Sequence, residues 1–173
     1  MQKLTCAIVA AGAVLAADTT TAAVTCDPMV TDCPPPTGIS CDNASLTNGV
    51  IWPPNHKMVE EDIMDVSSGA GAVTIQITSI YQSEPVNALG SGNTAPDGII
   101  ANSTDSTIPS IAYVRAERAG PGTGRIYIIS YTATDTGGNT CSSSLTVYVP
   151  HDQGQGYTPT PTGNWYDSTK PAP

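Results

Sequence analysis

The chain has 173 residues, which is room for one domain of ordinary size with flanking segments. Apolar residues make up 39% of it and charged residues only 12%, a composition typical of strands and turns that argues against a helical bundle. With 15 acidic and 6 basic side chains, its formal charge of −9 would repel a phosphate backbone, so we expect no nucleic-acid partner.

Residues 1–17 have the pattern of a secretory signal peptide. Lys3 follows the initiator, and residues 4–17 are almost wholly apolar and small, with Val14 and Ala16 at the positions that precede a cleavage site. The apolar run is too short to span a bilayer, so we expect no membrane insertion. Export predicts a secreted, extracellular or cell-surface protein. The alternative is a retained apolar N-terminal strand.

Residues 18–40 are rich in Thr, Ala and Pro, which predicts an extended arm or linker. Cleavage would leave four of the five cysteines, an even number that predicts two disulfides in an exported chain. Three pairings of Cys26, Cys33, Cys41 and Cys141 can be drawn. In one of them Cys26–Cys33 closes a short loop and Cys41–Cys141 joins the start of the domain to its last strand. A zinc site is not favoured, because no CxxC spacing occurs.

Residues 41–153 show the alternation of apolar and polar residues that predicts strands. Residues 126–133 are apolar on both faces, as in the middle of a sheet, and Cys141, Leu145, Val147 and Val149 share one face of the last strand. Seven short strands divided by Gly, Pro, Asn and Asp predict an all-β, Greek-key, immunoglobulin-like sandwich. The expected strands cover residues 46–52, 57–66, 72–81, 97–103, 110–118, 125–134 and 140–149.

Residues 154–173 form a Thr/Pro-rich C-terminal tail without apolar periodicity. Segments of this composition carry O-linked sugar in many secreted proteins, so we expect either a glycosylated tail or a disordered one.

Two sets of motifs resemble known modules. Asp42, the run YTATDTGGNTC (131–141) and the run LTVYV (145–149) resemble the hyalin-repeat (HYR) type of immunoglobulin-like domain. That family pairs an early cysteine with one just after its DxxGN turn, which implies a Cys41–Cys141 disulfide. A set of bacterial exported modules is more similar still, through residues 52–57 (WPPNHK), 83–87 (SEPVN), 115–118 (RAER) and 149–153 (VPHDQ).

The resemblance covers about residues 40–153. It implies an exported bacterial protein in a modular, structural or adhesive context, and it implies no catalytic activity. Such modules usually lie inside long multidomain proteins, whereas here one module makes up most of the chain.

Alternate connections of a Greek-key sandwich lie at the same end, so the distinctive polar residues should gather at one end. We call this end the loop pole. It contains the first-to-second connection, the third-to-fourth connection, the fifth-to-sixth connection and the exit from the last strand. Its candidate residues are Trp52, Asn55, His56, Glu84, Asn87, Asp97, Arg115, Glu117, Arg118, Arg125, His151 and Asp152.

Several interpretations compete for these residues. In a structural network, Glu84, Glu117 and Asp97 pair with Arg115, Arg118 and Arg125, because the planar guanidinium bonds carboxylates in two directions. A calcium site could use the same carboxylates, although no Asp-x-Asp-x-Asp loop is present. The loop pole could instead bind a glycan or a protein. A transition-metal site made of His56, His151 and Asp152 requires the first and last strands to lie parallel and side by side.

No GxSxG, HExxH or phosphate-binding glycine loop occurs, and Glu84 with Glu117 is a weak basis for a glycosidase pair. We therefore expect no enzyme and no cofactor, with calcium as the one alternative. The expected function is a structural or adhesive subunit that self-assembles into a fibre or surface layer by adding its N-terminal arm to a neighbour's sheet edge. The alternative is a soluble glycan- or protein-binding module, stabilised by calcium, that uses the loop pole.

Overall fold

The computed structural model of the chain describes residues 38–154, 159–161 and 163–171. All of the described residues lie within one unit of the chain, Pro34–Pro173. The expected signal peptide, residues 18–37 of the expected arm, Cys26 and Cys33 therefore lie outside the described residues. The described residues contain no helix that is long and apolar enough to cross a membrane.

The regular structure in the described residues is entirely β-strand, as the composition predicted. The ten strands are β1 (Ile39–Ser40), β2 (Ser45–Leu46), β3 (Met58–Met64), β4 (Ser67–Ser68), β5 (Val73–Gln82), β6 (Gly98–Ala101), β7 (Ile111–Arg115), β8 (Gly124–Asp135), β9 (Thr140–Pro150) and β10 (Tyr166–Asp167). Six of the seven expected strands overlap β3 and β5 to β9, and their ends differ from the observed ends by no more than three residues.

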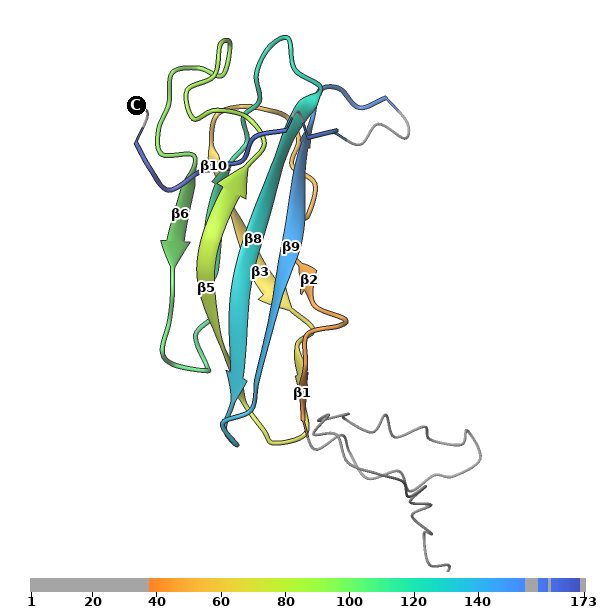
Figure 1. The fold of residues 1–173 in the computed structure, drawn as a ribbon, viewed down its shortest axis with the longest axis vertical. Coiled ribbons are helices and arrows are strands. Elements are labelled where there is room, and N and C mark those ends of the chain that lie inside the picture. The colour runs from red at the N-terminus through yellow and green to blue at the C-terminus, as the bar shows by residue number, and fades with distance from the viewer. Residues whose placement is uncertain (1–37, 155–158, 162, 172–173) are drawn as a thin grey trace, which may run out of the picture. The chain divides into compact units, whose positions relative to one another are not determined.

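Eight strands form two four-stranded antiparallel sheets, with the orders β10-β5-β8-β9 and β2-β3-β7-β6 (Figure 1). β1 and β4 form a separate two-stranded ribbon. Apolar side chains from both sheets fill the space between them, and Ile80, Val114, Tyr127 and Val147 are fully buried there. This arrangement is consistent with the β-sandwich that the sequence predicted.

The alternation along β8 and β5 explains which side chains reach the core. β8 lies between β5 and β9; its odd-numbered side chains are mostly buried, whereas its even-numbered side chains from Ile128 to Thr134 are partly or fully exposed. The register between β5 and β8 shifts by one residue between Ile77 and Ser79. This bulge lets Ile77 and Ile80 both face the core although they are three positions apart.

The first expected strand, 46–52, is divided between the two sheets. Ser45 and Leu46 pair with β3 as β2. Further along, the N–H of Ile51 donates to the carbonyl of Tyr148 and the N–H of Tyr148 donates to the carbonyl of Gly49, each at 2.8 Å. Val50 thereby pairs in parallel with Tyr148 of β9. The segment between β2 and residue 51 crosses from one sheet to the other and closes one side of the sandwich.

The C-terminal segment also belongs to the sandwich, which the sequence did not predict. β10 pairs with β5, with Tyr166 opposite Gln82. The N–H of Ser168 donates to the carbonyl of Ile80 at 3.0 Å, and its own carbonyl accepts from Asp97 at 3.0 Å and from Gly98 at 2.8 Å. Ser168 thus connects β5 to the start of β6. A strand as short as β10 has no periodicity that would reveal it in the sequence.

The Cys41–Cys141 disulfide is present, and its two cysteines are 100 residues apart in the chain. It attaches the segment after β1 to the start of β9. A covalent link between such distant residues removes much of the conformational freedom of the unfolded chain. Its contribution to stability is therefore expected to be large.

We predict that replacing both Cys41 and Cys141 with Ala lowers the free energy of unfolding by about 4 to 5 kcal/mol, the value expected for a closed loop of roughly 100 residues. Urea denaturation of the parent and the double variant measures this difference. A loss below about 1 kcal/mol would mean that the unfolded chain is already compact without the crosslink.

Candidate functional site

Arg125 lies at the centre of the loop pole. β8 turns its odd-numbered side chains inward, so Arg125 continues the buried row that contains Tyr127, and its exposed fraction is 0%. Its Nε donates to Glu84 Oε2 at 3.0 Å. Its Nη1 donates to Asp97 Oδ2 at 2.8 Å and to the Tyr127 hydroxyl at 3.1 Å. This guanidinium is held by carboxylates on two sides, the condition under which a buried charge is tolerated.

Arg115, at the end of β7, holds two loops to that strand. Its Nη1 donates to the carbonyl of His56 at 2.9 Å, and its Nη2 donates to the carbonyl of Pro96 at 2.7 Å. Its Nε lies 3.3 Å from Asp97 Oδ1 and 3.9 Å from Glu117 Oε2. One planar fork thus connects the loop before β3 with the loop before β6.

The carboxylates and a nearby amide complete the connections. Glu84 Oε2 accepts from the N–H of Ala119 at 2.8 Å, which fixes the turn between β7 and β8. Glu117 Oε2 lies 3.1 Å from His56 Nδ1 and accepts from the Thr94 hydroxyl. The side chain of Gln82 donates to Asp97 Oδ2 at 2.8 Å and to the Glu84 carbonyl at 3.0 Å. Each of the three loops of the pole is therefore bonded to the others through buried side chains.

The charges in this cluster nearly balance. Three buried carboxylates (Glu84, Asp97 and Glu117) face two guanidiniums, and His56 lies at the margin with its side chain 48% exposed. Burial alone would lower the pKa of Arg125, but the Tyr127 hydroxyl, Asp97 and Glu84 hold it above its usual value. Burial also raises the pKa of Tyr127, the largest effect on that group. Arg125 therefore stays charged, and Tyr127 stays neutral, throughout the ordinary pH range.

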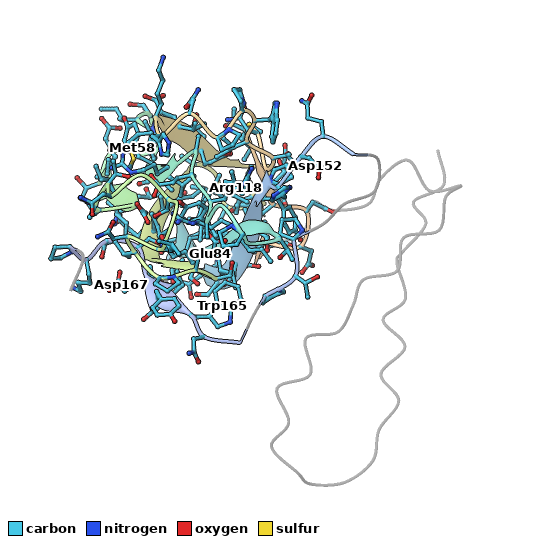
Figure 2. The ribbon with its side chains drawn as sticks, turned by 90° about the horizontal axis from the view of Figure 1, so that it is seen from above. Met58, Glu84, Arg118, Asp152, Trp165 and Asp167 are labelled. Carbon is cyan, nitrogen blue, oxygen red and sulfur yellow. A yellow bond between two sulfur atoms is a disulfide. The ribbon has the colours of Figure 1, made fainter. Side chains whose placement is uncertain are left out.

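Three other predicted residues, Arg118, His151 and Asp152, lie at the surface of the pole. Arg118 donates to the carbonyls of Ala119 and Gly120 at 3.2 and 3.3 Å instead of to a carboxylate. His151 Nδ1 lies 3.3 Å from Asp152 Oδ2, and both side chains are solvent-accessible. In the view onto the pole, Glu84 and Arg118 lie over the middle of the sandwich and Asp152 lies at its margin (Figure 2).

Three further predicted residues do not join the cluster. Trp52 is 39% exposed, and Asn55 and Asn87 are exposed. The side chain of Asn55 accepts from the N–H of Lys57 at 3.1 Å, and Asn87 has a left-handed backbone with φ of 65°. These two asparagines therefore shape turns, a role in which they are common.

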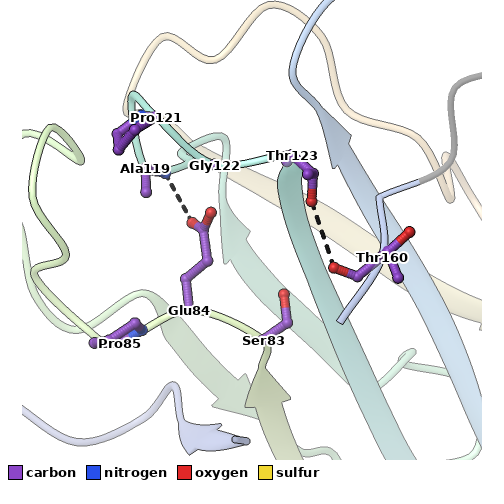
Figure 3. A pocket seen from close by; sticks show the side chains of 9 residues that line it. Ser83, Glu84, Pro85, Ala119, Pro121, Gly122, Thr123 and Thr160 are labelled. Carbon is purple, nitrogen blue, oxygen red and sulfur yellow. Dashed lines mark hydrogen bonds between the residues drawn. The ribbon is translucent and has the colours of Figure 1, made fainter. Parts of the chain in front are cut away.

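A shallow pocket of about 210 Å³ opens beside the cluster, between the loop after β5, the turn before β8 and Thr160 (Figure 3). Glu84 reaches up from the pocket floor to Ala119. A Cβ atom on Gly122 would lie 2.6 Å from Glu84 Oε1, so a larger residue at that position would displace this carboxylate. The carboxylate in the pocket therefore serves to hold the turn.

No group of three or more His, Cys, Asp or Glu side chains within the described residues is arranged to hold a metal ion. Glu84 and Asp97, which the calcium hypothesis would use, are bound by Arg125. His56 contacts Glu117, whereas His151 contacts Asp152, although the first and last strands do run parallel at Val50. These contacts supply neither metal hypothesis with a ligand set.

Glu61 is a buried carboxylate that the sequence analysis missed. Its exposed fraction is 0%, and its Oε2 accepts from the N–H groups of Asn48 at 2.9 Å and Gly49 at 3.4 Å. It thereby supports the segment that crosses between the sheets. Burial, the largest effect, raises its pKa above the usual value. The available signal was its position two residues before Ile63, on the inward face of β3.

Comparison of the chain with family models, curated proteins and solved structures found no match in any of the three. The function proposed below is therefore based on the contacts, burial and charges of the described residues.

We predict that Arg125→Met lowers the free energy of unfolding by about 3 to 5 kcal/mol, because it leaves Glu84 buried without a counter-charge and leaves Asp97 with Arg115 alone. The control is Lys57→Met, which removes an exposed cation from the same pole and should change stability by no more than about 0.5 kcal/mol. Chemical denaturation measures both variants. Equal effects of the two substitutions would show that the buried network does not hold the pole together.

We predict that Glu61→Gln changes how stability depends on pH. The folded-state pKa of Glu61 is raised, so the stability contributed by its protonated form is fully present below the unfolded-state pKa of about 4.5 and is lost as pH rises through the folded-state pKa. Relative to the parent, Glu61→Gln should therefore gain stability as pH rises from 4 to 7. Denaturation across that range tests this, and a difference that does not change with pH would contradict it.

Proposed function

We propose that the protein is a non-catalytic, secreted bacterial structural or adhesive module. In this proposal its sandwich is a Greek-key, HYR-like immunoglobulin-like domain, and its Thr/Pro-rich tail carries O-linked sugar. Copies assemble into a fibre or surface layer when the N-terminal arm of one adds as a strand to the sheet edge of the next.

The structural role is supported by the polar side chains of the loop pole, which mostly point inward and bond one another or the backbone. Glu84, Asp97 and Glu117 bind Arg125, Arg115 or backbone N–H groups, so these carboxylates are not free to act on a substrate. Buried networks of this kind hold loops that lack strand pairing. The loops of the pole are thus bonded to one another, which suits a structural module.

The edge of β9 supports strand addition. Tyr148 bonds outward to Gly49 and Ile51, so the backbone groups of Thr146, Ser144 and Ser142 face the same outer edge, because the direction alternates along a strand. Among the described residues, no strand pairs with the part of this β9 edge that precedes Tyr148 in the chain.

This edge also lacks the usual protection against pairing. Residues 140–149 contain no Lys and no Pro, the residues that commonly block strand addition at an edge. The proposed donor, residues 18–38, contains a Pro-free stretch at 19–25 (TTTAAVT), and its Thr and Val residues are favoured in strands. An unprotected acceptor and a strand-forming arm are the two parts that this mode of assembly needs.

We predict that deleting residues 18–38 abolishes filaments or oligomers while the sandwich still folds. Electron microscopy and size-exclusion chromatography of the purified secreted protein show the assembly, and the melting temperature reports folding.

A second variant, Ser144→Pro, tests the acceptor edge. It removes an outward N–H that has no strand partner among the described residues, so it should weaken assembly while the domain remains folded. Normal filaments formed by the arm deletion would rule out strand addition by the arm.

A further inference from the structure

The outer face of the sheet β10-β5-β8-β9 is open to solvent over most of its length. In β8, Tyr127, Ile129 and Tyr131 are buried against the core, so the even-numbered side chains between them point outward. The strand register places outward residues of β5 and β9 on either side of them. β8 is a central strand, so this face lies on a rigid scaffold.

Most of this face is made of neutral, hydrogen-bonding side chains. Ser130 bonds Ser144 and Thr132 bonds Ser142 across the strands, each at 2.9 Å. None of these residues is charged, although the chain carries a formal charge of −9. The outward residues of this part are Thr74, Gln76, Ser79, Ser130, Thr132, Thr134, Thr140, Ser142, Ser144 and Thr146.

Aromatic side chains border the neutral area near β10. Tyr81 is 42% exposed and pairs with Asp167, and Trp165, two residues before Asp167, is 39% exposed (Figure 2). Asp167, at the margin of the face, already accepts from the Thr169 hydroxyl at 2.7 Å and lies 3.8 Å from Lys170 Nζ. The exposed rings of Tyr81 and Trp165 thus lie at the border of the serine and threonine hydroxyl groups.

We propose that this face binds a neutral polysaccharide chain. Hydroxyl groups both donate and accept hydrogen bonds, so a surface of serines and threonines can bond the hydroxyls of sugars in either direction. The faces of Tyr and Trp rings carry negative charge density and attract the weakly positive C–H groups of a sugar ring. The face has no Lys or Arg for an anionic polymer, and its acceptors suit a ligand that carries many hydroxyls.

The size and rigidity of the face fit a chain and not a single sugar. From Ile128 to Thr134 the exposed outer row of β8 is ~20 Å long, at about 3.3 Å per residue. Side chains on strands keep their positions when a ligand binds, so little ordering is needed. This inference goes beyond the structural role proposed above and does not depend on filament formation.

The experiment is affinity electrophoresis of the full chain in native gels that contain soluble neutral polysaccharides: hydroxyethylcellulose, β-1,3-glucan, xylan, galactomannan and glycol chitin. We expect retardation by at least one of them and none by carboxymethylcellulose, which has a cellulose backbone with added negative charge. Tyr81→Ala and Trp165→Ala should each weaken binding about tenfold, since one aromatic contact contributes on that scale.

Trp52→Ala is the matched control, because Trp52 is also 39% exposed but lies at the loop pole. It should leave binding unchanged. Ser142→Asp places a charge among the hydroxyls and should abolish retardation, and its melting temperature verifies that it is folded. The proposal is overturned if none of the neutral polymers retards the protein, or if Trp52→Ala weakens binding as much as Trp165→Ala does.

Discussion

The pairing of Arg125 with Glu84 and Asp97 is the interaction on which the loop pole depends. A fully buried guanidinium at the end of a core strand is tolerated only with carboxylates on both sides, and these come from the loop after β5 and from the residue before β6. Those loops have little backbone pairing of their own. Their positions are therefore set by charge at the end of the sandwich, whereas apolar packing sets the positions of the strands.

Much of this arrangement follows from the sequence. Alternation located the long strands, and the rule that alternate connections share an end brought Glu84, Asp97 and Arg125 together before any contact was known. The sequence could not show that Arg118 donates to backbone carbonyls instead of to a carboxylate, because both kinds of acceptor lie within reach of an arginine at this position. β10 was missed, and the parallel pairing of Val50 with Tyr148 was considered only as the condition for a metal site. Two-residue pairings leave no periodic pattern, and only the tertiary fold decides which edge they join.

The loop pole and the outer face of the sheet β10-β5-β8-β9 differ in the kind of side chain that they expose. The charged and conspicuous residues, which suggested a binding site, largely point inward and bond one another. The serines and threonines of β8 and β9, which were not among the predicted site residues, form the open face. Conspicuous residues in a β-sandwich can therefore be those that maintain the fold, while the surface available to a ligand is made of unremarked side chains.

The Cys41–Cys141 disulfide has a mechanical consequence. It spans 100 residues, including most strands of both sheets. Tension applied to the chain before Cys41 and after Cys141 passes directly through the sulfur–sulfur bond. The strands from β2 to β8 lie off that covalent path, so the chain between the two cysteines cannot be drawn out as long as the disulfide is intact. Under force the molecule would extend only through its flanking segments and the strands that follow the second cysteine.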